Sequence, residues 1–176
     1  GACSAAAPTR DADAVFADRM AAALLQWRGS PSTGPFAYTI PGTVLAASIG
    51  DGAVVATASG DGAPGVPLDE ASTFHIGSMT KLFTAALVMQ LDQEGVLSLD
   101  DTIDRWFPSA PGGAQITVRM LLQHASGLSE LDFDLVGHVT PQQLVDDVFT
   151  RAPVFAPGTE YAYLNAGYIM LGRIAE

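Results

Sequence analysis

The sequence predicts an α+β fold in which a helix and a β-hairpin precede a mainly helical stretch. Residues 11–28 show apolar side chains at helical spacing. Two short β-branched runs, 43–49 and 53–59, flank a glycine-rich turn. From residue 78 onward the apolar pattern becomes helical again. Strands followed by a run of helices are typical of α+β domains.

The first predicted helix runs from Asp11 to Arg28. Its apolar positions are Phe16, Met20, Leu24 and Trp27. Asp11 and Asp13 stand at its start, where the helix dipole favours negative charge. Residues 29–42 are rich in proline and glycine and predict a long connection.

The hairpin is predicted from its turn composition. Gly50, Asp51 and Gly52 separate the two apolar runs, and glycine tolerates the positive φ that tight turns require. Residues 60–68 contain several glycines and prolines, so we expect a loop there.

A buried helix is expected from Ser78 to Glu94, with Gly95 as its stop. The side chains expected on its inward face are Leu82, Ala85, Ala86 and Met89.

Capping residues predict further helices in the later part of the chain. Thr117 caps a short helix that ends at Leu122, and Thr140 begins a capping box with Gln143. The inward positions of that second helix are Leu144, Val145, Val148 and Phe149. Residues 159–164 are expected to be extended, and a last helix follows from Ala166.

Composition excludes several classes of partner. The formal net charge is −11 over 176 residues, so nucleic acid and anionic membrane surfaces would repel the chain. The single cysteine, Cys3, excludes an intramolecular disulfide and a thiolate metal cage. His75, His124 and His138 share no metal-binding spacing with carboxylates, so we expect structural roles for them and neither a metal nor a cofactor.

The N-terminal residues resemble the end of a bacterial lipoprotein signal. Cys3 is followed by small residues that would form a tether, although an ordinary flexible tail explains the same composition. In either case we expect a flexible tail at 1–10 and a domain at 11–176. A lipid anchor on Cys3 would place the protein outside the cytoplasm. No apolar run reaches the roughly 18 residues that a membrane span needs.

Ser78 and Lys81 are the first candidates for chemistry. They stand three positions apart at a helix start, so their side chains project from one face. A lysine amine can accept the serine proton, and the N–H of Ser78 at the helix N-terminus can form half of an oxyanion hole. A capping serine followed by a surface lysine is the plain alternative.

Tyr163 and Asn165 are the second pair. On an extended segment they point the same way. A phenol near a lysine can relay a proton, and an amide can bind a substrate peptide group. A buried tyrosine and a helix-capping asparagine are the alternative.

Three blocks occur together and in order, and they carry a resemblance. They are FHIGSMTK at 74–81, LLQHASGL at 121–128 and PGTEYAYLN at 157–165. Together they resemble the serine β-lactamase-related family, which includes class C β-lactamases, D-alanyl-D-alanine carboxypeptidases of the penicillin-binding type and esterases. The resemblance runs from about Pro41 to Glu176.

The resemblance implies a role for each matching residue. Ser78 is the acylated nucleophile, Lys81 activates it, Tyr163 is the general acid/base and Asn165 orients the substrate. The block from His124 to Leu128 corresponds to a structural turn. The implied fold is an antiparallel sheet flanked by helices plus a mostly helical part, with the active site between them.

The sequence also departs from the family pattern. Nothing corresponds to the Lys-Thr-Gly or His-x-Gly strand that closes the family's site. The resemblance therefore implies that the domain at 11–176 is incomplete, and we expect its C-terminal strands to belong to a further segment or a second chain. His75 stands where the family often has arginine, and Leu164 where it often has serine.

The expected activity is that of a serine hydrolase with an acyl-enzyme at Ser78. Its substrates would be D-alanyl-D-alanine peptides, β-lactams or short esters. The alternative function is a penicillin-binding sensor that is acylated slowly or never. Ser126, close to His124 in the sequence, is a second and much weaker candidate for the nucleophile.

Overall fold

The computed structural model describes residues 12–29, 40–48, 51 and 54–176. Its contacts divide the chain into two compact units, Gly1–His75 and Ile76–Glu176. The tail expected at 1–10, with Cys3, lies outside the described residues. Within the described part, no helix is long and apolar enough to cross a membrane.

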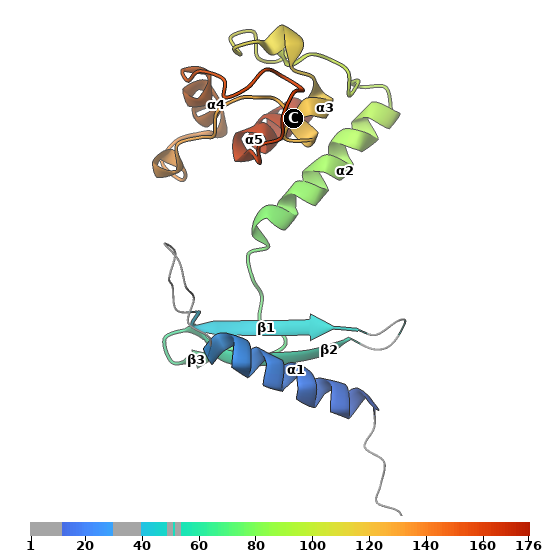
Figure 1. Ribbon diagram of the computed structural model, residues 1–176, viewed down its shortest axis with the longest axis vertical. Helices are drawn as coiled ribbons and strands as arrows, with labels where there is room; N and C mark the ends of the chain where they lie inside the picture. The colour runs from blue at the N-terminus through green and yellow to red at the C-terminus, as the bar shows by residue number, and fades with distance from the viewer. Residues whose placement is uncertain (1–11, 30–39, 49–50, 52–53) are drawn as a thin grey trace, which may run out of the picture. The chain divides into compact units, whose positions relative to one another are not determined.

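The first unit consists of one helix and a small sheet, drawn in blue to blue-green in Figure 1. The helix is α1 (Ala12–Gly29), and the strands are β1 (Gly42–Ala47), β2 (Val55–Ala63) and β3 (Val66–Pro67). The sheet order is β1-β2-β3, and β1 and β2 are antiparallel. The expected helix and hairpin are therefore present, and α1 packs on β1 and β2.

The apolar stripe of α1 faces inward as its spacing predicts. Met20 and Leu24 are buried and Phe16 is half-buried, while the side chain of Trp27 lies outside the described part. The prediction of a loop at 60–68 is wrong, because β2 continues to Ala63 and pairs with β3. The N–H of Leu68 bonds the carbonyl of Gly60 at 2.9 Å, so backbone pairing overrides the turn-like composition.

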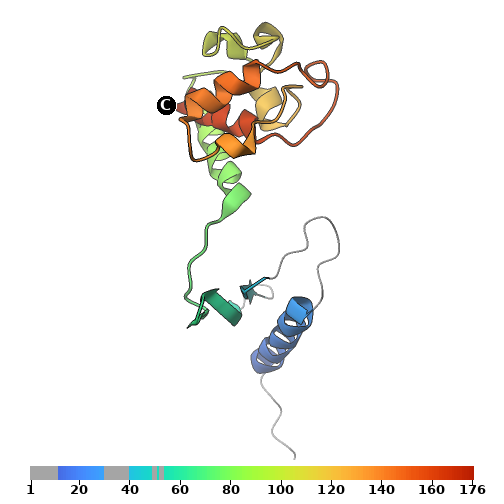
Figure 2. The same cartoon turned by 90° about the vertical axis from the view of Figure 1, so that its left-hand side faces the viewer.

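The second unit is helical, and its other helices pack around one central helix, α5 (Asn165–Ala175). Its longer helices are α2 (Thr80–Gln93), α4 (Pro141–Phe149) and α5. A short helix, α3 (Val118–Leu122), lies between α2 and α4 in the sequence. Single 3-10 turns are η1 (Gly77–Met79), η2 (Ile103–Arg105), η3 (Gly113–Gln115) and η4 (Phe133–Leu135). Helix α5 contacts α2, α3 and α4, as the red helix among its neighbours shows in Figures 1 and 2.

The core of this unit lies around α5. Fully buried side chains from different elements meet there: Val88, Ile103, Ile116, Val118, Leu121, Val145, Val148, Met170 and Leu171. The expected caps are confirmed: Thr117 accepts the N–H of Met120, and Thr140 forms the complete capping box with Gln143. Leu144, Val145 and Val148 are buried and Phe149 is partly buried against the core, also as expected.

The predicted inward face of α2 is wrong for three of its four residues, and only Ala85 is half-buried. Leu82 is 68% exposed and Met89 is 58% exposed, whereas Val88 is fully buried. The helix carries apolar residues on every side, so its sequence does not single out one face. Packing against α5 selects the stripe that contains Lys81, Ala85 and Val88, spaced as neighbours on a helix surface.

Candidate active site

Ser78 lies in the turn η1, directly before α2, and its side chain is exposed. Gly77 enters this turn with φ +54°, a conformation that strains residues with a Cβ. Neither η1 nor α2 has a side-chain cap, so Ser78 does not cap the helix. The hydroxyl is therefore available for other contacts.

Lys81 lies one turn further, in the first turn of α2. Its Nζ is 3.3 Å from Ser78 Oγ and 2.7 Å from Asn165 Oδ1. The same Nζ lies 4.8 Å and 5.6 Å from the ring centroids of Tyr163 and Tyr168. The predicted contact between Ser78 and Lys81 is thus present, and Lys81 is half-buried rather than free in solvent.

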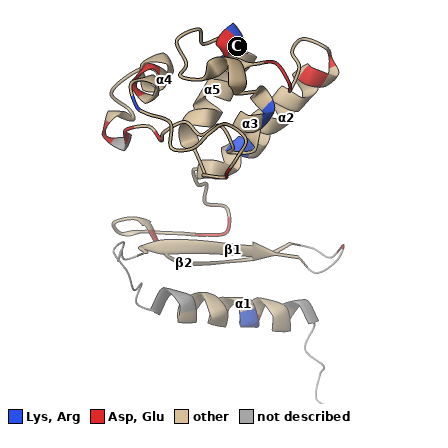
Figure 3. Cartoon of the chain, turned by 45° about the horizontal axis from the view of Figure 1, so that its top comes forward, with Lys and Arg blue, Asp and Glu red and all other residues tan. Residues whose placement is uncertain are grey.

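Lys81 differs from the other basic residues of its unit, which Figure 3 shows in blue. Each of the four arginines between 76 and 176 forms an ion pair with a carboxylate. Among the described residues of this unit, Lys81 has no carboxylate partner, and its contacts are neutral groups. Lys81 is therefore turned to the Ser78 hydroxyl and to neutral groups and not to a carboxylate.

Tyr163 reaches Ser78 from the extended segment before α5. Its hydroxyl donates to Ser78 Oγ at 2.8 Å, across 85 positions of sequence. The side chain is 47% exposed, which excludes the alternative of a buried structural tyrosine. Ser78 Oγ therefore accepts from Tyr163 on one side and from Lys81 on the other.

His124 holds the segment that carries Tyr163. Its backbone carbonyl accepts the N–H of Ala162 at 3.0 Å, and its Nδ1 accepts the N–H of Leu164 at 3.0 Å. Its ring lies 4.6 Å from the Tyr163 ring, centroid to centroid. The structural role expected for His124 is therefore present, in the left-handed conformation at φ 57°.

Asn165 is the first residue of α5, and its amide oxygen accepts from Lys81 at 2.7 Å. It does not cap the helix, because the N-cap is Leu164 and no side-chain cap bond is formed. The helix N-terminus binds Glu130 instead, whose carboxylate accepts the backbone N–H groups of Asn165 and Ala166 at 2.8 and 3.2 Å. Sequence reasoning missed Glu130. No local signal pointed to it, because Asn165 at the helix start offered a capping side chain of its own, and only the structure shows that it does not cap.

The surroundings of the site shift the pKa values of three of its titratable side chains. Hydrogen bonding to Lys81 is the main cause that lowers the pKa of Tyr163 from 10.0, and its hydrogen bond with Ser78 adds to this. Burial chiefly lowers the pKa of His124 from 6.5, and the charge of Lys81 acts in the same direction. Burial raises the pKa of Tyr168 above 10.0. His124 is thus kept neutral, as its role as an acceptor requires.

A pocket of about 380 Å³ opens beside these groups. Ser78, Lys81 and Asn165 line it together with Tyr168, whose hydroxyl donates to the carbonyl of Leu122. The weaker candidate Ser126 is 2% exposed, and its Oγ accepts the N–H of Leu128. Within the described part of the chain, no group of His, Cys, Asp or Glu side chains is arranged to hold a metal ion.

The chain is similar to known proteins over most of its length. Penicillin-binding protein 4 of Amycolatopsis lactamdurans is 35% identical over 149 residues, which cover 79% of this chain and 39% of that protein. A D-amino acid amidase from Ochrobactrum anthropi SV3, solved with L-phenylalanine amide, matches 76% of this chain and 39% of its own at 33% identity and a TM-score of 0.68. A D-stereospecific amidohydrolase from Streptomyces sp. matches 92% of this chain and 48% of its own, at 27% identity and a TM-score of 0.71.

The chain spans between 26% and 39% of the length of three curated penicillin-binding relatives, two from Bacillus subtilis and one from Amycolatopsis lactamdurans. The family model described as Beta-lactamase matches residues 12–176, which is nearly the whole chain. The α+β fold expected from the sequence is confirmed by these neighbours. The chain belongs to the beta-lactamase family.

Proposed function

We propose that the protein cleaves amide bonds by acyl transfer, with Ser78 as the nucleophile. The observation that carries this proposal is the position of Ser78 Oγ, 2.8 Å from the hydroxyl of Tyr163 and 3.3 Å from Nζ of Lys81. A serine hydroxyl becomes a good nucleophile only when a base accepts its proton. Two titratable groups lie within reach, and one of them has a lowered pKa.

In the first half of the reaction, Tyr163 in its phenolate form accepts the Ser78 proton while Lys81 stabilises its negative charge. Ser78 Oγ forms a bond to the substrate carbonyl carbon, and the carbonyl oxygen takes up the electron pair. Tyr163 then gives the proton to the leaving nitrogen, the C–N bond breaks and the amine departs. An ester between Ser78 and the acyl group remains.

In the second half, water replaces the amine. Tyr163 accepts a proton from the water, the hydroxide oxygen attacks the ester carbonyl, and the proton returns to Ser78 Oγ as the C–O bond breaks. The products are a carboxylic acid and the free enzyme. The backbone N–H of Ser78 serves as one oxyanion donor, and we propose that a further segment or a second chain supplies the other.

D-configured amides and peptides are the substrates that we place first. The support is similarity to a D-amino acid amidase and a D-stereospecific amidohydrolase. β-Lactams and short esters present the same electrophilic carbonyl and remain alternatives within the same mechanism. Asn165 would bind the substrate amide beside the scissile bond, since it borders the pocket.

Mass spectrometry of the intact protein tests the proposal. The full-length protein is treated with a fluorescent penicillin and, separately, with D- and L-phenylalanine amide, and adducts are mapped to peptides. We expect a covalent adduct on Ser78 that decays with turnover and is absent in Ser78→Ala. We expect Lys81→Ala and Tyr163→Phe each to lower acylation by several orders of magnitude, because the three groups act as a unit.

Two outcomes would contradict the proposal. An adduct on Ser126, or turnover that persists in Ser78→Ala, would remove Ser78 from the reaction. A Ser78 adduct that forms but does not decay would instead favour the alternative of a slowly acylated sensor. Ser126→Ala is the matched control, since it deletes the hydroxyl of a serine that is buried away from the pocket.

A further inference from the structure

Glu130 has an unusual concentration of hydrogen bonds at its carboxylate. One oxygen, Oε2, accepts the backbone N–H and the side-chain Nδ2 of Asn165, at 2.8 and 3.1 Å. The other, Oε1, accepts the backbone N–H groups of Leu131 and Ala166, at 2.9 and 3.2 Å. The carboxylate is therefore a cap for α5 and, through Nδ2, a clamp on the Asn165 side chain.

The clamp determines which end of the Asn165 amide faces Lys81. A carboxylate only accepts hydrogen bonds and an ammonium only donates them. With Nδ2 on Glu130, Oδ1 points to Lys81 and accepts at 2.7 Å. The opposite orientation would place an NH2 group against the ammonium and an oxygen against the carboxylate. Glu130 thus excludes the flipped amide by charge and donor pattern alone.

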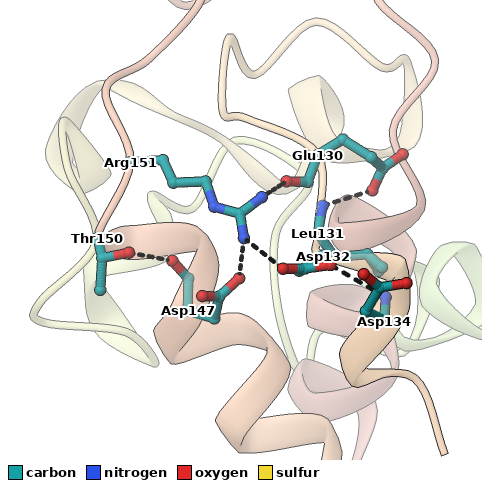
Figure 4. A network of polar contacts seen from close by, with 7 residues as sticks. All are labelled: Glu130, Leu131, Asp132, Asp134, Asp147, Thr150 and Arg151. Carbon is teal, nitrogen blue, oxygen red and sulfur yellow. Dashed lines mark hydrogen bonds and ion pairs between the residues drawn. The ribbon is translucent and has the colours of Figure 1, made fainter.

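Glu130 is itself held from the opposite side. Nη1 of Arg151 donates to the Glu130 carbonyl at 2.8 Å, and Nη2 pairs with Asp147 of α4 at 2.5 Å. Asp132 lies 3.9 Å from the same Nη2 and accepts the backbone N–H of Asp134 through its other oxygen. Figure 4 shows this network, with Arg151 between the two segments.

The contacts form a continuous chain from α4 to Ser78. Arg151 fixes the backbone at Glu130, Glu130 fixes the Asn165 amide, and that amide fixes the lysine nitrogen. Lys81 Nζ is then 3.3 Å from Ser78 Oγ. Each of these links has an ionised group as its donor or acceptor, and such charge-assisted hydrogen bonds are stronger than neutral ones.

We propose that Glu130 is a positioning residue for the acyl-transfer reaction, acting through Asn165 on Lys81. This inference rests on the proposed function of Ser78. Removal of the Glu130 charge frees the Asn165 amide to rotate, and Lys81 can then move away from Ser78. A displacement of 1 Å in a reacting group costs on the order of a hundredfold in rate.

The test combines Glu130→Gln with Asn165→Ala in the full-length protein. The rate of Ser78 acylation by the fluorescent penicillin should fall about 10- to 100-fold in Glu130→Gln. In the Asn165→Ala background the same change should cost less than about twofold, because the amide through which it acts is gone. Equal losses in both backgrounds would show that Glu130 only caps α5, and would overturn the inference.

A second readout does not depend on acylation. The side-chain NH2 signal of Asn165, observed by NMR with ¹⁵N-asparagine and assigned with Asn165→Ala, should move in Glu130→Gln. An unchanged signal would overturn the inference. Glu160→Gln is the matched control, since it removes the same charge from the exposed surface of the segment that carries Tyr163, and it should leave the rate and the signal unchanged. If Ser78 of the wild-type protein is not acylated at all, that result contradicts the proposed function and not the role of Glu130.

Discussion

The His124 side chain supports the tyrosine of the site in two ways, and leucine in its place removes both. It accepts the N–H of Leu164 at 3.0 Å and lies 4.6 Å from the Tyr163 ring. Leu164 is only 4% exposed, so water does not readily replace the lost acceptor. The unsatisfied N–H costs about 1–3 kcal/mol and the lost aromatic contact about 0.5–1.5 kcal/mol. We therefore expect His124→Leu to lower the free energy of unfolding by about 1.5–4.5 kcal/mol.

His124→Asn is the matched control for this change. Asparagine tolerates the left-handed conformation at φ 57° and offers an oxygen acceptor close to the position of Nδ1. It should lose only the ring contact, about 0.5–1.5 kcal/mol. Urea unfolding followed by circular dichroism measures both variants. If leucine and asparagine destabilise equally, the hydrogen bond to Leu164 is not the main contribution and the reasoning is refuted.

The same residue makes stability depend on pH. Burial and Lys81 lower the pKa of His124 in the folded state, so the unfolded chain binds the proton more readily. This contribution to stability is therefore fully present above about pH 6.5 and is lost as the pH falls through the lower, folded-state pKa. Urea midpoints between about pH 8 and about pH 5 should fall more in wild type than in His124→Asn.

Three further predictions concern the tyrosine, a turn and a cap. Lys81→Met should raise the pKa of the Tyr163 phenol back toward 10.0, as ¹³C-tyrosine NMR titration would detect; an unchanged titration would show that Lys81 does not perturb it. Gly127→Ala should lower the free energy of unfolding by about 2–5 kcal/mol, because φ is +74° and a Cβ would lie 2.1 Å from the Phe155 carbonyl oxygen; a neutral effect in thermal melts would contradict this. Thr140→Ala should cost about 1 kcal/mol through loss of the capping box, whereas Thr140→Ser should retain most of it.

Local features of the molecule could be predicted because they depend on neighbouring residues. The capping box at Thr140 and the approach of Ser78 and Lys81 both arise within a single helical turn. The hairpin of β1 and β2 follows from turn composition and β-branched runs. These interactions need no information from distant parts of the chain.

Prediction failed where two packing solutions share one sequence pattern. Helix α2 is apolar on every side, so its spacing could not say that Val88 rather than Leu82 is buried. The continuation of β2 to Ala63 depends on pairing with β3, which overrides a glycine-rich composition. In both cases a neighbouring element makes the choice.

Glu130 shows the same limit at the site. Nothing in its local sequence distinguishes it from other acidic residues, and its partner Asn165 is 35 positions away. Asn165 at the helix start offered a capping side chain of its own, so the sequence did not indicate that an acceptor must arrive from elsewhere.

The sequence by itself therefore determined the first helix, the hairpin, the caps at Thr117 and Thr140 and the candidate residues Ser78, Lys81, Tyr163 and Asn165. Only the tertiary structure decided that Tyr163 reaches Ser78 across 85 positions and that Asn165 turns its oxygen to Lys81. The physical reason is range. Caps and helical spacing act within one turn, whereas these contacts exist only because α5 packs against α2 and Glu130 holds the first residues of α5.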